Sequence, residues 1–135
     1  MKTMTNNLKY FSVLTLIFST IFFYYLFASL RAHSYGNIWL IALSFGVLLF
    51  ISGLILGRKD SVRHSRADLS FQYHLMTFII VNGIGIPWQL ISMGIDNASL
   101  INVAYQCVPW GIGLAIHYYF SSRSIKGVNK EEIFD

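Results

Sequence analysis

Four long stretches without Asp, Glu, Lys or Arg constrain this sequence more than any other feature. They cover residues 10–30, 38–57, 71–93 and 100–120, and they are 21, 20, 23 and 21 residues long. An α-helix needs about 20 apolar residues to cross a hydrocarbon core about 30 Å thick. Continuous apolar runs favour helices over the alternating strands of a membrane barrel. The sequence therefore predicts an all-α integral membrane protein with four transmembrane helices.

The composition agrees with this class of protein. Of the 135 residues, 55% are hydrophobic and only 12% are charged, whereas an ordinary soluble domain carries about 25% charged residues. A water-soluble chain of this length could not bury so much apolar surface. The first apolar run is longer than the core of a signal peptide, so we expect an uncleaved membrane span.

The distribution of basic residues predicts the orientation in the membrane. Nine of the ten Lys and Arg residues lie before the first span, between the second and third spans, or after the fourth, and Arg31 is the exception. By the positive-inside rule, both termini and the central linker face the cytoplasm. The net charge of +4 is thus a topology signal, with attraction to anionic lipid headgroups as a secondary effect, and we expect no nucleic-acid partner. The basic linker residues are Arg58, Lys59, Arg63 and Arg66.

Short connections between the spans predict two antiparallel helical hairpins. We expect a hairpin over residues 1–57, a cytoplasmic linker over 58–70, a second hairpin over 71–120 and a polar cytoplasmic tail over 121–135. In the first span, Ser12, Thr15 and Ser19 share one face, which is a common device for packing membrane helices. No connection is long enough for a soluble catalytic domain.

The second hairpin carries polar residues at matched positions. At about 100° per residue, the polar side chains of each span fall within one sector of its helix. If the hairpin turns near residues 95–96, His74 lies level with His117, and Gln89 lies level with Asn102. Amides exposed to lipid are costly, so we expect the two stripes to face each other as a polar seam. Its members are His74, Asn82, Gln89, Asn102, Gln106, Trp110 and His117.

Most of the polar seam has a structural interpretation. Gln89 and Asn102 are expected to form an interhelical hydrogen bond. Asn82 is expected to accept from the indole of Trp110, or to cap backbone groups freed by the prolines of these spans. Cys107 is expected to be a small packing residue. The glycines of the two spans are expected to let their backbones approach closely: Gly83, Gly85, Gly111 and Gly113.

The two histidines leave three interpretations open. They can make structural hydrogen bonds, hold a proton that titrates near neutral pH, or bind haem or a transition metal. Two His residues alone make an incomplete metal site, and the leading interpretation includes no cofactor. The sequence contains no nucleophile–base pair, phosphate loop or paired carboxylates, which weighs against an enzyme.

The segments "FQYHLMTFIIVNGIGI" and "VPWGIGLAIHYYF" resemble the bacterial 2TM domain family. That family shows an F-x-x-H-L start, a V-N pair and a W-G-x-G-L-x-x-H ending, and the resemblance covers residues 66–120. It implies a membrane hairpin that occurs alone or attached to signalling modules, without established chemistry. Phe78 and Pro109 depart from the family pattern. The matching positions are Phe71, His74, Leu75, Val81, Asn82, Trp110, Gly111, Gly113, Leu114 and His117.

The leading prediction is a multi-pass protein of the inner (cytoplasmic) membrane without catalytic activity. It would be an accessory, sensory or protective module whose partners are the lipid bilayer and either a second copy or another membrane protein. The alternative is a haem- or metal-binding redox or transport component that uses His74 and His117 as ligands.

Overall fold

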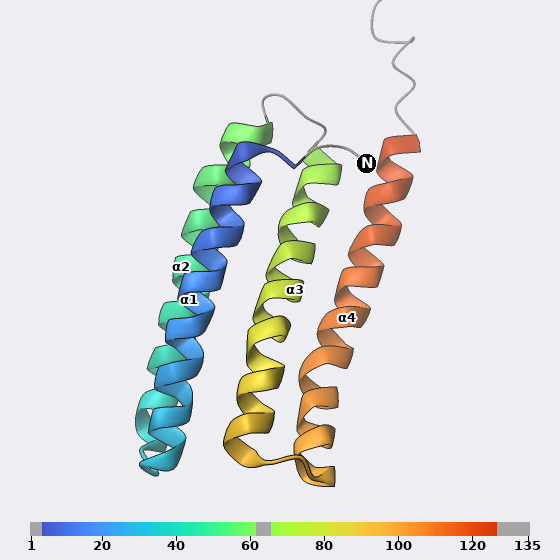
Figure 1. The fold of residues 1–135 in the computed structure, drawn as a ribbon. Coiled ribbons are helices and arrows are strands. Elements are labelled where there is room, and N and C mark those ends of the chain that lie inside the picture. The colour runs from blue at the N-terminus through green and yellow to red at the C-terminus, as the bar shows by residue number, and fades with distance from the viewer. Residues whose placement is uncertain (1–3, 62–65, 127–135) are drawn as a thin grey trace, which may run out of the picture.

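The computed structural model describes residues 4–61 and 66–126, and this part of the chain is almost entirely helical (Figure 1). Each of its four long helices is long and apolar enough to cross a membrane. The predicted all-α class is therefore confirmed, as is the prediction of four helices with the length and apolar composition of membrane spans. A short 3-10 turn, η1 (Tyr35–Asn37), precedes the second helix. The long helices are α1 (Asn6–Arg31), α2 (Ile38–Ser61), α3 (Arg66–Met93) and α4 (Asn97–Lys126).

The helices extend beyond the predicted spans into the polar segments. Helix α2 continues to Ser61 and α3 begins at Arg66, so most of the predicted linker over 58–70 is helical. Arg58 and Lys59 lie in the last turn of α2. Arg63 lies outside the described residues, as do residues 127–135 of the predicted tail. Polar residues continue a helix where water and headgroups can solvate its end, which is why absence of charge marks only the membrane-spanning part.

Local chemistry explains where helices begin and turn. Thr5 has extended backbone angles before α1, and its hydroxyl accepts from the backbone N–H of Leu8 at 3.1 Å, as an N-cap does. Between α3 and α4, Gly94 has φ +89°, which glycine adopts without steric cost. The Asp96 carboxylate then accepts from the backbone N–H of Ser99 at 2.7 Å and caps α4.

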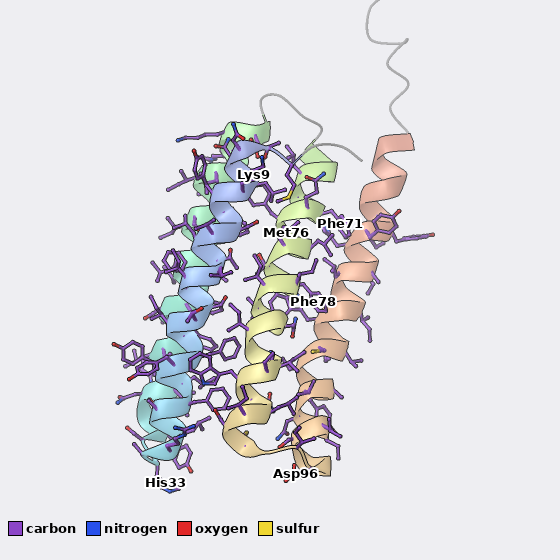
Figure 2. The ribbon with its side chains drawn as sticks, in the orientation of Figure 1. Lys9, His33, Phe71, Met76, Phe78 and Asp96 are labelled. Carbon is purple, nitrogen blue, oxygen red and sulfur yellow. The ribbon has the colours of Figure 1, made fainter. Side chains whose placement is uncertain are left out.

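Helix α1 packs against both α2 and α3, and α3 also contacts α2 and α4. Among the described helices, α4 packs against α3 only. In Figure 2, Lys9 lies at one end of the molecule, and His33 and Asp96 lie at the other. The buried residues of α1 recur about once per turn, as a helix between two neighbours requires. They are Leu8, Phe11, Thr15, Ser19, Phe23 and Phe27.

Two apolar clusters fill the interior around α1. One contains Leu8, Phe11, Leu69 and Tyr73, and the other contains Phe23, Phe27 and Val81. Between them along α1, the small side chains of Thr15 and Ser19 have no exposed surface. This burial confirms the prediction that the face packs against other helices. Small residues there let the helices approach closely.

The outer surface is strongly apolar. None of the residues in the most apolar 18-residue window of α2 is buried, and large hydrophobic side chains project from every helix (Figure 2). Such a surface far exceeds the apolar patches of soluble monomers. It fits a multi-pass membrane protein in which lipid covers the outer faces.

Candidate functional site

His74 on α3 and His117 on α4 meet between the two helices. Their ring centroids are 5.1 Å apart, and the ring planes are nearly perpendicular, at 88°. A small cavity of about 200 Å³ adjoins both rings and is also lined by Trp110, Gly113 and Leu114. The two histidines thus lie together at the depth that their spacing predicts, and they form the candidate site.

One nitrogen of this pair has an unmet bonding capacity. The Nε2 atom of His117 is buried and has no hydrogen-bond partner within the described part of the chain. An unsatisfied buried polar group costs about 1–3 kcal/mol. A ligand or a proton donor that reaches this nitrogen would recover part of that free energy.

The ring separation distinguishes between two kinds of ligand. With metal–nitrogen bonds of about 2.0–2.1 Å, two imidazoles on one tetrahedral ion place their ring centroids roughly 5 Å apart. Opposed axial ligands of a haem iron place them more than about 6 Å apart, with the porphyrin between the rings. The observed 5.1 Å fits the first arrangement. Among the described residues, no third His, Cys, Asp or Glu joins the pair, so within this part of the chain the two histidines are an incomplete set of metal ligands.

Asn82 occupies the middle of the polar seam and bonds across it. Its side-chain oxygen accepts from Nε2 of Gln106 at 3.3 Å and from Sγ of Cys107 at 3.1 Å. Its own amide nitrogen donates to the backbone carbonyl of Phe78 at 2.8 Å. The indole of Trp110 packs edge-on against the Phe78 ring, with centroids 5.6 Å apart. The prediction that Asn82 pairs with Trp110 was therefore wrong by about one helical turn.

The predicted Gln89–Asn102 pair was also wrong. Gln89 is buried and Asn102 is exposed, and within the part of the chain that the structure describes no hydrogen bond joins them. Val103 and Cys107, on the adjoining face of α4, are partly buried. The polar seam therefore meets α4 along the face that contains Val103 and Cys107. Asn102 lies at the edge of that face, so its side chain stays exposed.

The glycines do not serve the contact that the sequence predicted. A Cβ at Gly85 would meet the ring of Phe23 on α1 at 2.3 Å, so Gly85 allows α3 to approach α1. A Cβ at Gly111 would come no closer than 3.9 Å to Phe78, and Gly83 and Gly113 have open space around them. Gly85 therefore makes room for an aromatic ring of α1 and does not serve the α3–α4 contact.

Sequence reasoning missed a buried carboxylate that links three helices. Asp60, near the end of α2, is only 5% exposed. Its oxygens accept from the Thr5 hydroxyl, from Nδ2 of Asn7 at 2.8 Å and from the Tyr73 hydroxyl at 3.0 Å. These three donors are neutral, and they come from the start of α1 and from α3. Hydrogen bonds to a charged group are worth about 1.5–3 kcal/mol each, so this cluster fixes the ends of the helices.

A signal for Asp60 was present in the sequence. It follows Gly57 by three residues and continues the helical face of Gly53 and Gly57. Its position directly after Arg58 and Lys59 instead predicts a place in the solvated linker.

No protein-family model, curated protein or solved structure matches this chain. The resemblance of residues 66–120 to the 2TM domain family therefore stays a prediction. It depends on the motif positions, of which His74, Asn82, Trp110 and His117 all lie at the contact between α3 and α4.

Proposed function

We propose that this chain is a small multi-pass protein of the inner (cytoplasmic) membrane, without catalytic activity of its own. It would act as an accessory, sensory or protective module through contacts within the bilayer. The helices would form two antiparallel hairpins with both termini and the central linker in the cytoplasm. The nine-to-one distribution of Lys and Arg supports this orientation.

One observation carries the proposal of an accessory module. Helix α2 packs mainly on α1, and α4 packs on α3. Each leaves a long apolar face uncovered by the described chain. Leu43 on α2 and Tyr105 on α4 are 57% and 76% exposed. A chain with two such faces and little polar machinery is suited to binding a second copy or another membrane protein.

Photocrosslinking in the membrane tests this proposal. A photoreactive residue at Leu43 or Tyr105 is expected to give a discrete protein adduct, and the same residue at the buried Thr15 is the control that should give none. If neither exposed position gives a protein adduct, the chain contacts lipid only and the accessory role is contradicted.

Reporter fusions test the orientation separately. A fluorescent protein fused after Asp135 is expected to fold in the cytoplasm. A periplasmic phosphatase inserted at Gly36 is expected to be active, because that loop would lie outside. The opposite pattern would invert the topology and leave the helix packing unaffected.

The His74–His117 contact favours a second candidate function. Two imidazoles at 5.1 Å, with a buried unpaired nitrogen between α3 and α4, support binding of a first-row divalent metal. This would make the chain a metal-binding redox or transport component. The same separation speaks against haem held by both rings, since the porphyrin would need the space in which the rings now touch.

Metal analysis of the purified protein tests the second candidate. The expected result is one divalent metal per site, lost in His74→Gln and in His117→Gln. His33→Gln is the matched control, because His33 is exposed and pairs with Tyr35 near the α1–α2 connection. A metal-free wild-type protein, or a double variant that retains metal, contradicts metal binding at this pair.

A further inference from the structure

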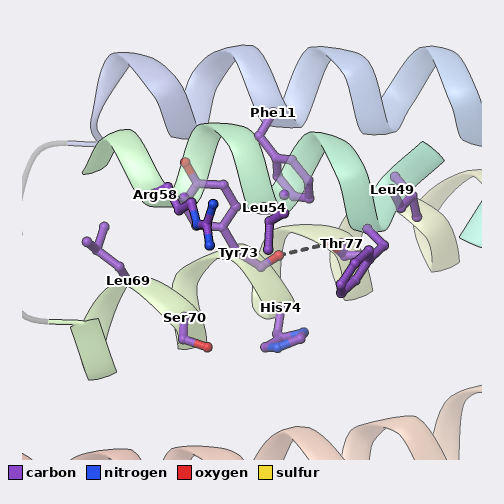
Figure 3. A pocket seen from close by; sticks show the side chains of 12 residues that line it. Phe11, Leu49, Leu54, Arg58, Leu69, Ser70, Tyr73, His74 and Thr77 are labelled. Carbon is purple, nitrogen blue, oxygen red and sulfur yellow. Dashed lines mark hydrogen bonds between the residues drawn. The ribbon is translucent and has the colours of Figure 1, made fainter. Parts of the chain in front are cut away.

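A groove runs between α2 and α3 at the end of the molecule that contains Asp60 (Figure 3). Its volume is about 650 Å³, larger than the cavity beside the two histidines. It exists because α2 and α3 each pack closely on α1 but only lightly on each other. Phe11 of α1 forms part of its wall.

The chemistry of the groove changes along its length. Arg58 on α2 and Ser70 on α3 line one end, near the last turn of α2. Farther along α2, the wall is formed by Leu54, Phe50 and Leu49. A cation and a hydroxyl thus stand at one end, and toward the other end hydrocarbon side chains of α2 line the groove together with His74 and Thr77 of α3.

The length of the groove matches one leaflet of a bilayer. Nine residues separate Arg58 from Leu49, which corresponds to about 13–14 Å along a helix. Half of the hydrocarbon core is about 15 Å thick. If Arg58 lies at the headgroups, the apolar wall reaches the middle of the membrane.

We propose that this groove binds one anionic phospholipid of the cytoplasmic leaflet. Its phosphate would lie at Arg58 and Ser70, and one acyl chain would run along Leu54, Phe50 and Leu49. Basic pockets between helices on the cytoplasmic side bind anionic headgroups in this way. The negative charge of Asp60 does not line the groove, because its carboxylate is turned toward Thr5, Asn7 and Tyr73.

The inference rests on the proposed membrane orientation only for the choice of leaflet. Binding can be measured in detergent, where orientation plays no part, so failure of binding and failure of the proposed topology are distinguishable.

Native mass spectrometry with a mixture of phosphatidylglycerol and phosphatidylcholine tests the charge at the headgroup end. Wild-type protein is expected to retain one phosphatidylglycerol in preference to phosphatidylcholine. Arg58→Gln should reduce this preference about fivefold, the factor expected for one cation near a membrane surface. Lys59→Gln removes the same charge from the next position, which does not line the groove, and should leave the preference unchanged. Equal loss in both variants would mean general surface attraction and would overturn the proposal.

A second pair of variants tests the groove itself. Gly57 lines the groove, and a Cβ there would meet no atom within 4 Å, so Gly57→Leu introduces a side chain into the groove without a clash at its Cβ. Gly46 is equally open but lies outside the groove on the same helix. We expect Gly57→Leu to lose the retained lipid and Gly46→Leu to keep it, with circular dichroism confirming that both are folded. Retention by Gly57→Leu, or displacement of the lipid by inorganic phosphate alone, would overturn the proposal.

Discussion

Replacing Gly85 by Ala perturbs a tightly packed contact between α1 and α3. The added Cβ would lie 2.3 Å from Cζ of Phe23, 2.9 Å from Cε1 and 3.0 Å from Cε2. All three separations are far below the 3.5–4.0 Å of favourable carbon contacts. The ring of Phe23 is 5% exposed and is enclosed by Phe22 and Phe27, with centroids at 5.0 and 6.4 Å. To make room for the Cβ, the ring has to shift within the packed cluster around Phe23.

The expected cost follows from two opposing effects. Overpacking a filled interior costs about 1–3 kcal/mol, whereas Ala in place of Gly within a helix gains up to about 1 kcal/mol. Gly83→Ala provides the matched control, because it lies on the same helix with open space around it. Gly83→Ala should therefore be neutral or stabilising. Gly85→Ala should be less stable than Gly83→Ala by about 1–3 kcal/mol.

Unfolding by SDS in mixed micelles, followed by circular dichroism, measures the free energy of unfolding of each variant. A double-mutant cycle then identifies the cause. Phe23→Leu removes the ring that the Cβ would meet, so Gly85→Ala should cost less in the Phe23→Leu background than in the wild type. Equal stability of Gly85→Ala and Gly83→Ala, or strict additivity with Phe23→Leu, would refute this account of the α1–α3 contact.

Two further predictions use the same unfolding assay. Tyr73→Phe removes one donor from the buried Asp60 carboxylate and should cost about 1–3 kcal/mol, whereas Tyr10→Phe, at an exposed position, should change stability by less than about 0.5 kcal/mol; equal effects would mean that the carboxylate cluster is not stabilising. Asn82→Leu breaks the bonds across the polar seam and should cost about 1 kcal/mol, while Asn102→Leu on the outer face of α4 should be neutral or stabilising. If Asn102→Leu lowers the free energy of unfolding as much as Asn82→Leu does, Asn102 is part of the polar seam and the reasoning is contradicted.

The elements of the fold could be predicted because bilayer thickness sets helix length directly. Runs without charge marked each membrane-spanning segment, and helical spacing brought His74 and His117 to the same level on facing helices. These inferences need only local sequence and the geometry of one hairpin. The two imidazole rings are in contact in the structure, as this spacing predicts.

The remaining features depend on which helix lies next to which, and local periodicity does not contain that information. Gly85 was assigned to the α3–α4 contact because α4 is its neighbour in sequence, but its space is filled by Phe23 of α1. Asp60 depends on Thr5 and Asn7, which lie more than fifty residues earlier in the chain. Asn102 was misplaced because a rotation of α4 by less than one residue step moves a side chain from the seam to its edge.

The attachment of α4 along a single neighbour has a consequence for the order of assembly. Helices α1, α2 and α3 are joined through the Asp60 cluster and the two apolar clusters around α1, and all of these contacts can form before α4 leaves the ribosome. We therefore expect α4 to dock last onto this three-helix unit, and a mechanical pull on its end to detach it first. The histidine pair, which needs His117, would be the last feature to form during synthesis and the first to be lost under force.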